Sequence, residues 1–224
     1  METATDAARP DAMGFVLAGG ESRRMGQDKA LIEFAGRRLL EQALGILKQA
    51  GLDAAIACGH STARRSVLEG FAPVVEDGEP GRGPLAGICA SLAFTAAERA
   101  VFLPVDLPLA PAALIGFLLD HAAITGAPVT IASVNGYAQT FPAVVTRAAL
   151  PALRKELEAG RGGCFAGFQA ASASLGEDLR IIPVEPAIQA GQVTHPAGLP
   201  AARWFMNVNT PADLRRAGAW HRII

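Results

Sequence analysis

A glycine-rich, basic segment at residues 17–29 is the part of the sequence best suited to chemistry. It contains Leu17–Gly20, then Arg24, and it ends at Asp28 and Lys29. Glycines let backbone amides approach a ligand closely, and consecutive amides bind anions. Lysine and arginine add positive charge, and arginine binds phosphate with paired donors. We therefore predict a phosphate-binding loop, with an ordinary glycine-rich turn as the alternative.

Two aspartates follow apolar runs. Asp106 comes directly after Ala100–Val105, and its carboxylate is a natural ligand for Mg²⁺, which binds one or two carboxylates plus substrate phosphates. The alternative is an aspartate that starts a turn. Asp77 follows Ala72–Val75 and offers two acceptors to a ribose hydroxyl pair or to the N–H edge of guanine. The Gly83–Gly87 run after it could lay backbone against a flat ring.

Short apolar runs alternate with segments of helical period along most of the chain. The runs are Phe15–Ala18, Ala54–Ala57, Ala72–Val75, Ala100–Val105, Val129–Val134 and Ala143–Thr146, and the helical segments are Leu40–Leu47, Leu85–Leu92, Leu114–Leu118 and Leu150–Leu157. This alternation predicts a single three-layer, Rossmann-like α/β domain over residues 14–224 with a mostly parallel sheet. Ligands bind beyond the carboxyl ends of such strands. Pro104 fits a strand only where its nitrogen faces no ladder partner.

Composition excludes several classes of protein. Of 224 residues, 50% are apolar and 18% charged, which suits a buried core and not a disordered protein. A net charge of −1 supplies no general field for nucleic acid or an anionic membrane. No apolar run is long enough to span a membrane. Cys58, Cys89 and Cys164 form no CxxC pair, so we expect no cysteine metal motif and no disulfide framework.

Two stretches lie outside the regular alternation. Residues 1–13 are small and polar and lack the apolar centre of a signal peptide, so we expect a disordered extension on a cytoplasmic protein. Residues 171–203 hold four prolines and three glycines without a clear period. They predict an irregular insertion within the domain.

The chemistry-bearing motifs resemble those of a known enzyme group. Leu17–Gly20, Ser22, Arg24–Gly26 and Asp28-Lys29 resemble the signature of the nucleotidyltransferases that include sugar-nucleotide pyrophosphorylases. This chain has the form of the signature with two glycines, Gly19-Gly20. This form is most similar to the molybdenum cofactor guanylyltransferase (MobA) family, over residues 14–170 and 204–218, and the similarity includes Gly83–Gly87, Asp106 and Asn207–Pro211. The resemblance implies a nucleotidyltransferase that moves GMP from Mg·GTP to molybdenum-molybdopterin and releases pyrophosphate.

The resemblance also implies roles for individual residues. Lys29, Arg24 and Asp106 would be catalytic, Asp106 would bind Mg²⁺, and Asn207 and Asn209 would lie on the acceptor side. The implied nucleotide-binding residues are Leu17, Ala18, Gly19, Gly20, Lys29, Asp77, Pro84, Leu85 and Asp106. The implied substrates are GTP and molybdopterin, and the implied partner is a molybdoenzyme or its chaperone.

Departures from the family pattern bear on specificity. Cys58-Gly59-His60 stands where the family often has an asparagine after the second strand, and Phe141-Pro142 stands where a His-Pro pair is expected. On the acceptor side we expect part of 171–203, with Arg180 and Arg203 supplying charge. If residues 171–203 are only a surface loop with no role in binding, we expect the acceptor contacts in residues 135–142.

Three other functions remain open on the sequence. A cytidylyltransferase acting on the same pterin typically shows Ala-Gly in place of Gly19-Gly20, and a sugar-phosphate nucleotidyltransferase is a further option. A catalytically idle nucleotide-binding module is the non-enzyme alternative, and Lys29 and Asp106 argue against it.

Overall fold

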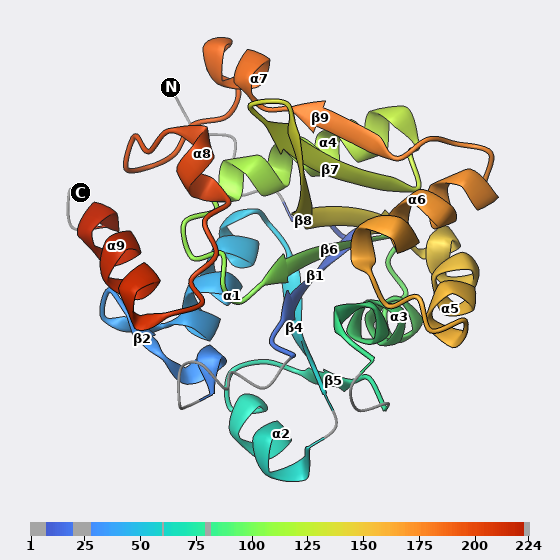
Figure 1. Ribbon diagram of the computed structural model, residues 1–224, viewed down its shortest axis with the longest axis horizontal. Helices are drawn as coiled ribbons and strands as arrows, with labels where there is room; N and C mark the ends of the chain where they lie inside the picture. Colours follow the sequence, from blue (N-terminus) through green and yellow to red (C-terminus); the bar gives the residue numbers. More distant parts are fainter. Residues whose placement is uncertain (1–7, 20–27, 60, 79–81, 222–224) are drawn as a thin grey trace.

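The computed structural model describes residues 8–19, 28–59, 61–78 and 82–221 (Figure 1). Its elements are β1 (Ala12–Leu17), η1 (Lys29–Leu31), β2 (Glu33–Phe34), β3 (Arg37–Arg38), α1 (Leu39–Gln49), β4 (Asp53–Cys58), α2 (Thr62–Leu68), β5 (Val74–Glu76), α3 (Pro84–Phe94), β6 (Arg99–Pro104), α4 (Ala112–Thr125), β7 (Val129–Val134), β8 (Tyr137–Thr146), η2 (Arg147–Ala149), α5 (Leu150–Glu158), α6 (Cys164–Ser174), β9 (Arg180–Pro183), α7 (Glu185–Gln189), α8 (Ala201–Trp204) and α9 (Pro211–His221). Within these ranges, seven strands form one sheet in the order β5-β4-β1-β6-β8-β7-β9.

The sheet is mostly parallel, as predicted. The pairs β5-β4, β4-β1, β1-β6 and β7-β9 are parallel, whereas β8 runs antiparallel to both β6 and β7. Two hydrophobic clusters lie on its opposite faces, one under α1 and α4 and the other under α3, α5 and α6. The protein is therefore a three-layer α/β domain (Figure 1).

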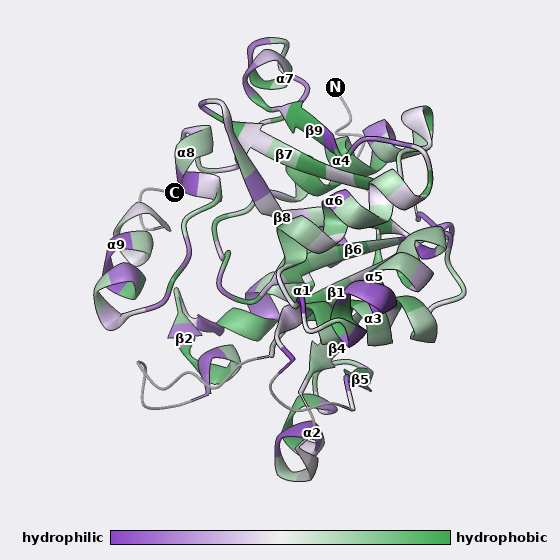
Figure 2. Cartoon of the chain, turned by 45° about the vertical axis from the view of Figure 1, so that its right-hand side comes forward, coloured by the Kyte–Doolittle hydropathy of each residue, from purple (hydrophilic) through white to green (hydrophobic). Residues whose placement is uncertain are grey.

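The central strands are unbroken apolar runs because both of their faces are covered. Phe15 and Phe102 are fully buried and their rings stack at 5.6 Å on the side of α3 and α6. Their neighbours Val16 and Leu103 are equally buried in the cluster on the opposite face. Figure 2 shows the hydrophobic colour of β1 and β6 at the centre of the sheet. A strand buried on both faces needs apolar residues at every position, which is the pattern that the sequence displays.

Pro104 meets the condition that a proline imposes on a strand. The amide of Val105 donates to the Leu17 carbonyl on β1 at 3.1 Å, so the nitrogen of Pro104, one residue earlier, faces the β8 side. On that side the pairing of β6 with β8 ends at Phe102 opposite Ala143. The proline nitrogen therefore lies where the ladder has already ended.

The strand β8 is longer than the predicted run Ala143–Thr146. It begins at Tyr137 after a tight turn in which Asn135 and Gly136 have φ angles of 52° and 78°. Asn-Gly favours the turn that joins antiparallel strands in a hairpin. Because β8 runs against its neighbours, its first residues lie at the carboxyl edge of the parallel strands. The hairpin thus adds a wall to that edge.

Residues 9–13 belong to the domain, whereas the prediction placed them in a disordered extension over residues 1–13. Ala12 and Met13 pair with β6 and β4 in the sheet, and Asp11 forms an ion pair with Arg99 at 2.8 Å. The first residues of β1 do not form an apolar run, so the sequence did not indicate that they pair in the sheet. Residues 1–7 of the predicted extension lie outside the described ranges.

Residues 171–203 also contain more regular structure than predicted. They hold the end of α6, the strand β9, α7 and the start of α8, and β9 pairs with β7 at the edge of the sheet. The prolines fit these elements because Pro183 ends an edge strand and Pro186 lies in the first turn of α7. None of the helices in the described ranges is long and apolar enough to cross a membrane.

Candidate functional site

Four loops lie in a row at the carboxyl edge of the parallel strands. Since β5, β4, β1 and β6 are neighbours in this order, the residues that follow them are also neighbours in this order. These residues are Asp77, Gly59, Ala18-Gly19 and Asp106. The first residues of β8 and the segment before α9 extend the row on the side of β6. The edge therefore places the predicted nucleotide residues beside the predicted acceptor residues.

Three of the predicted residues meet at one point. The Lys29 ammonium (Nζ) lies 2.9 Å from Asp106 Oδ2 and 2.5 Å from Asn209 Oδ1. The side chains of Lys29 and Asp106 are 15% and 22% exposed, so the pair is partly shielded from solvent. Lys29 and Asn209 are far apart in the chain, and the fold alone brings them together.

The position of Asn209 is fixed by two backbone contacts. The amide of Val208 donates to the carbonyl of Asp106 at 2.9 Å, which attaches this segment to the loop after β6. The amide of Asn209 donates to the Asp213 carboxylate at 3.2 Å. A hydrogen bond from the Thr210 hydroxyl holds the pKa of Asp213 below its usual range, so the carboxylate stays ionised. The start of α9 thus holds Asn209 in place against Lys29.

The described part of the chain directly after β1, Ala18 and Gly19, presents backbone at the edge of the sheet. The side chain of Leu17 is buried in the core, so it cannot reach a ligand at the edge. The carbonyl of Leu17 accepts a hydrogen bond from the amide of Val105. The amide of Ala18 donates to the carbonyl of Ala57 at 2.9 Å. Gly19 is exposed, and a Cβ added to it would meet nothing within 4 Å. Among the described residues after β1, Gly19 is therefore the one whose backbone a phosphate could approach.

The loops after β4 and β5 bring Asp77 next to Gly59. Asp77 is half-buried, its amide donates to the Cys58 carbonyl at 3.2 Å, and a Cβ on Gly59 would lie 4.0 Å from Asp77 Oδ2. Asp77 and Gly59 lie on the side of the edge away from Asp106. Of Cys58-Gly59-His60, which stands where the family often has an asparagine, His60 lies outside the described residues.

The start of α3 contributes backbone rather than side chains. Gly83 precedes the helix with φ 72°, a conformation that favours glycine, and the exposed Pro84 occupies the first turn. Leu85 is fully buried against α5 and α6, so its side chain belongs to the core. A ligand could meet Pro84 directly, but it could meet only the backbone of Leu85.

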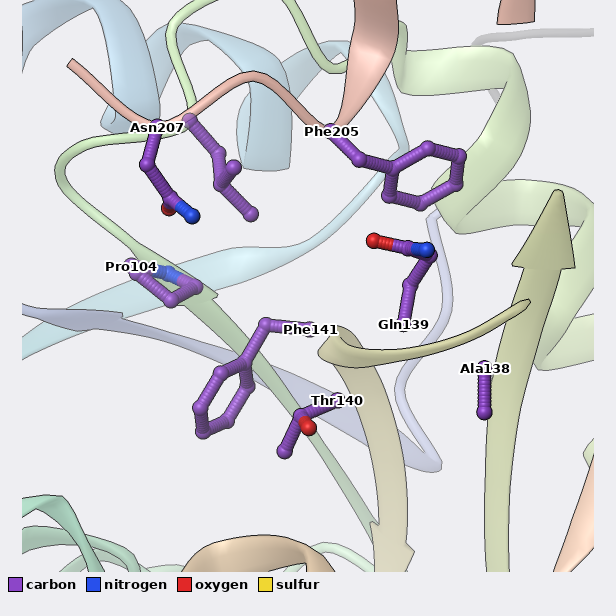
Figure 3. Close-up of a pocket in the computed structure, with 8 residues that line it drawn as sticks. Pro104, Ala138, Gln139, Thr140, Phe141, Phe205 and Asn207 are labelled. Atoms are coloured by element: carbon purple, nitrogen blue, oxygen red, sulfur yellow. The ribbon is translucent and has the colours of Figure 1, made fainter. Parts of the chain in front are cut away.

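A pocket of about 220 Å³ lies beside the Lys29 cluster. It is lined by Pro104, Leu107, Ala138, Gln139, Thr140, Phe141, Phe205 and Asn207. It forms where β8 diverges from β6 after their last pair. Figure 3 shows the side-chain amides of Gln139, on β8, and of Asn207, in the segment before α9, directed into the space between these two segments. Asn207 thus lines the pocket, whereas Asn209 contacts Lys29.

The polar pocket residues Gln139 and Thr140 were not singled out from the sequence. Gln139 and Thr140 belong to the predicted alternative stretch 135–142, and the Asn135-Gly136 turn was a signal that β8 begins just after it. Gln139 Nε2 donates to the Tyr137 carbonyl at 3.0 Å, which holds its amide in place.

Of the two arginines predicted to serve an acceptor phosphate, Arg180 lies opposite Thr130 near the amino end of β7, away from the carboxyl edge. Arg203 stacks over the Trp220 ring at 4.1 Å. Gly20 and Arg24, predicted for nucleotide binding and catalysis, lie outside the described residues.

The cysteines are placed for packing. Cys58, Cys89 and Cys164 are all buried. Burial raises the pKa of the Cys58 thiol, and it raises those of Cys89 and Cys164 to about 11 and about 12. A buried thiol with a raised pKa stays protonated at neutral pH, and the thiolate rather than the thiol is the reactive form.

Comparisons with known proteins show to which family the chain belongs. A family model described as a MobA-like NTP transferase domain matches residues 14–174. A molybdenum cofactor guanylyltransferase of Acidiphilium cryptum is 35% identical over 210 residues, which cover 91% of this chain and 92% of that protein. One from Xanthomonas euvesicatoria is 47% identical over 107 residues, which cover 47% of this chain and 52% of that protein.

Solved structures show the same fold. Molybdopterin-guanine dinucleotide biosynthesis protein A of Archaeoglobus fulgidus has a TM-score of 0.76 at 22% identity, covering 95% of this chain and all (100%) of that one. A putative glucose-1-phosphate thymidylyltransferase of Bacillus anthracis has a TM-score of 0.70 at 15% identity, covering 95% and 96%. The family model spans well over half of the chain, and the Acidiphilium relative is similar along nearly all of it. This chain is therefore a nucleotidyltransferase that belongs to the MobA-like NTP transferase family.

Proposed function

We propose that this protein transfers GMP from Mg·GTP to molybdopterin and releases pyrophosphate. The observation that carries the proposal is the cluster of Lys29, Asp106 and Asn209, which lies between loops suited to a nucleotide and a pocket suited to an acceptor. The names of relatives from Acidiphilium cryptum and Pelotomaculum thermopropionicum support the choice of guanine and of the molybdenum cofactor.

The reaction is a displacement at phosphorus. A terminal phosphate oxygen of molybdopterin attacks the α-phosphorus of GTP, the bond from this phosphorus to the oxygen that bridges to the β-phosphate breaks, and pyrophosphate leaves. The attacking oxygen is already an anion, so no protein base has to activate it. Catalysis then depends on holding two anions in line and on offsetting the charge that grows on the leaving group.

The residues around Lys29 suit a magnesium ion. Asp106 Oδ2 and Asn209 Oδ1 both lie within hydrogen-bond distance of one ammonium, so these oxygens converge on a common point. Oxygen is the ligand type that Mg²⁺ prefers, and one or two protein ligands suffice when substrate phosphates complete the shell. Asp106 and Asn209 would hold the ion in place of the Lys29 ammonium, which would then contact the triphosphate, and the ion would supply positive charge there.

The other groups divide between the two substrates. Lys29, with its ammonium beside the same oxygens, and the open backbone at Gly19 would bind the triphosphate. Asn207 and Gln139 would offer amide hydrogen bonds to the pterin in the pocket next to them. The order along the edge is then base, phosphates, acceptor.

We predict that the protein binds GTP more tightly than CTP or ATP by about tenfold or more. Guanine presents two neighbouring N–H donors, which the Asp77 carboxylate can accept, whereas adenine and cytosine leave buried acceptors unpaired at about 1–3 kcal/mol each. Asp77→Asn introduces a competing donor and is expected to reduce this preference. Calorimetric titration with each nucleotide measures the effect.

Asp53→Asn is the control, because Asp53 is exposed at the start of β4, on the opposite edge of the sheet. It should keep the parent's preference. Equal affinity of the parent for CTP and GTP would instead favour a cytidylyltransferase.

Transfer itself is tested with GTP that carries an isotopic label on the α-phosphate. The proposal requires the label to appear on a pterin product when molybdopterin is present. A label that remains in GTP, or that passes to a sugar phosphate instead, would overturn it.

A further inference from the structure

The side chain of Arg64, on α2, joins the two ends of the connection that follows β1. Its Nε donates to Asp28 Oδ2 at 2.5 Å, and its Nη2 donates to Asp28 Oδ1 at 2.8 Å. The same Nη2 donates to the carbonyl of Ala18. Ala18 lies just before residues 20–27 and Asp28 lies just after them. One guanidinium therefore links Ala18 to Asp28.

The contact with Asp28 acts on the turn that carries Lys29. Asp28 Oδ1 also accepts the amide of Ala30 at 3.0 Å, and so caps the short helix η1, whose first residue is Lys29. Lys29 in turn reaches Asp106 and Asn209. The contacts thus run from Arg64 through Asp28 to the ammonium at the centre of the candidate site.

The environment favours arginine over any other cation at this position. The side chains of Arg64 and Asp28 are only 20% and 24% exposed, so solvent screens their contact less than it screens a surface pair. Arginine bonds a carboxylate with two parallel donors and still has a donor for a carbonyl. Lysine carries the same charge on a single atom and cannot form the paired contact.

We propose that Arg64 is a positioning residue for nucleotide binding, acting through Lys29. By tying Asp28 to Ala18, it sets the place of the Lys29 ammonium relative to the backbone at Gly19, and both groups face the triphosphate of a nucleoside triphosphate. This inference rests on the proposed function. The competing explanation is a contact that only holds α2 against the sheet.

The first test compares three variants by calorimetric titration with Mg·GTP and by melting temperature. Arg64→Lys and Arg64→Ala are expected to weaken GTP binding by about tenfold or more, which corresponds to about 1.4 kcal/mol. Arg65→Ala is the matched control, because the exposed Arg65 lies on the same helix and pairs with Glu69 and Glu76. It should change affinity by no more than about twofold, roughly the scale of a surface pair.

The second test separates positioning from a general loss of structure. In a Lys29→Ala background, the further effect of Arg64→Lys on GTP affinity should shrink to about twofold or less, since the group that it positions is gone. A merely structural contact would reduce affinity by the same factor with or without Lys29. This comparison holds even if Arg64→Ala proves unstable.

The outcomes distinguish the two proposals. A parent that binds no GTP overturns the proposed function and this inference with it. A parent that binds GTP while Arg64→Lys binds it equally well overturns only the role of Arg64. Equal losses in both Lys29 backgrounds also overturn that role.

Discussion

Replacement of Asp106 by asparagine is expected to slow turnover about a hundredfold while the protein remains folded. The change keeps the shape of the side chain but removes a negative charge from the cluster with Lys29 and Asn209. Loss of such preorganised charge costs on the order of 3 kcal/mol in the barrier. The asparagine keeps an oxygen that can accept from the Lys29 ammonium, so the protein is expected to remain folded. Initial rates of pyrophosphate release, together with a melting curve, measure both effects.

Asp120→Asn provides the control for this variant. It is the same chemical change, and it breaks an ion pair of 2.7 Å with Arg9 on a 59% exposed side chain of α4. Turnover should not change. The role of Asp106 would be refuted if its asparagine variant turned over within about threefold of the parent.

Replacement of Lys29 by alanine is expected to weaken GTP binding or slow transfer by ten- to a hundredfold. A charged hydrogen bond to phosphate is worth about 1.5–3 kcal/mol, whereas an ion pair with no other role contributes nothing to catalysis. The contact of Lys29 with Asp106 and Asn209 places its ammonium at the edge where we expect the triphosphate. Titration with GTP and a kinetic assay of the same variant give the two measurements.

Lys48→Ala is the matched comparison, since Lys48 is exposed in the last turn of α1. Its GTP affinity and turnover should equal those of the parent. Unchanged affinity and unchanged turnover in Lys29→Ala would instead show that the lysine serves only its ion pair. The melting temperature of both variants should stay close to that of the parent.

The architecture was predictable where a local pattern determines it. Strands buried on both faces, such as β1 and β6, are unbroken apolar runs, and α1 and α5 carry apolar side chains at helical spacing on one face. Asp106 could be placed at the carboxyl edge because it directly follows such a run. The position of Pro104 in a strand could be explained only from the structure, which shows that the pairing of β6 with β8 ends before it.

The missed elements lack that local signal. The edge strand β9 is largely exposed and ends in Pro183, so neither apolar runs nor alternation marked it. The first half of β8 is exposed or half-buried, and only the Asn135-Gly136 turn indicated it. In both cases, pairing with β7 decides the structure, and a partner strand is not visible in a local window of sequence.

The contacts within the site were beyond sequence reasoning for a similar reason. Asn209 was expected beside the pterin, yet its side chain reaches Lys29 across 180 positions of the chain. Arg64 contacts Asp28 across 36 positions, from a helix that the sequence analysis did not predict. Spacing along the chain says nothing about such pairs, because the order of strands in the sheet creates them.

The most direct measurement of the central claim is pyrophosphate release with each of the four nucleoside triphosphates, with and without molybdopterin. The proposed function predicts release with GTP only when molybdopterin is present, and about tenfold or more less with CTP, ATP or UTP. Release with CTP equal to that with GTP, or release from GTP that does not depend on molybdopterin, would contradict it.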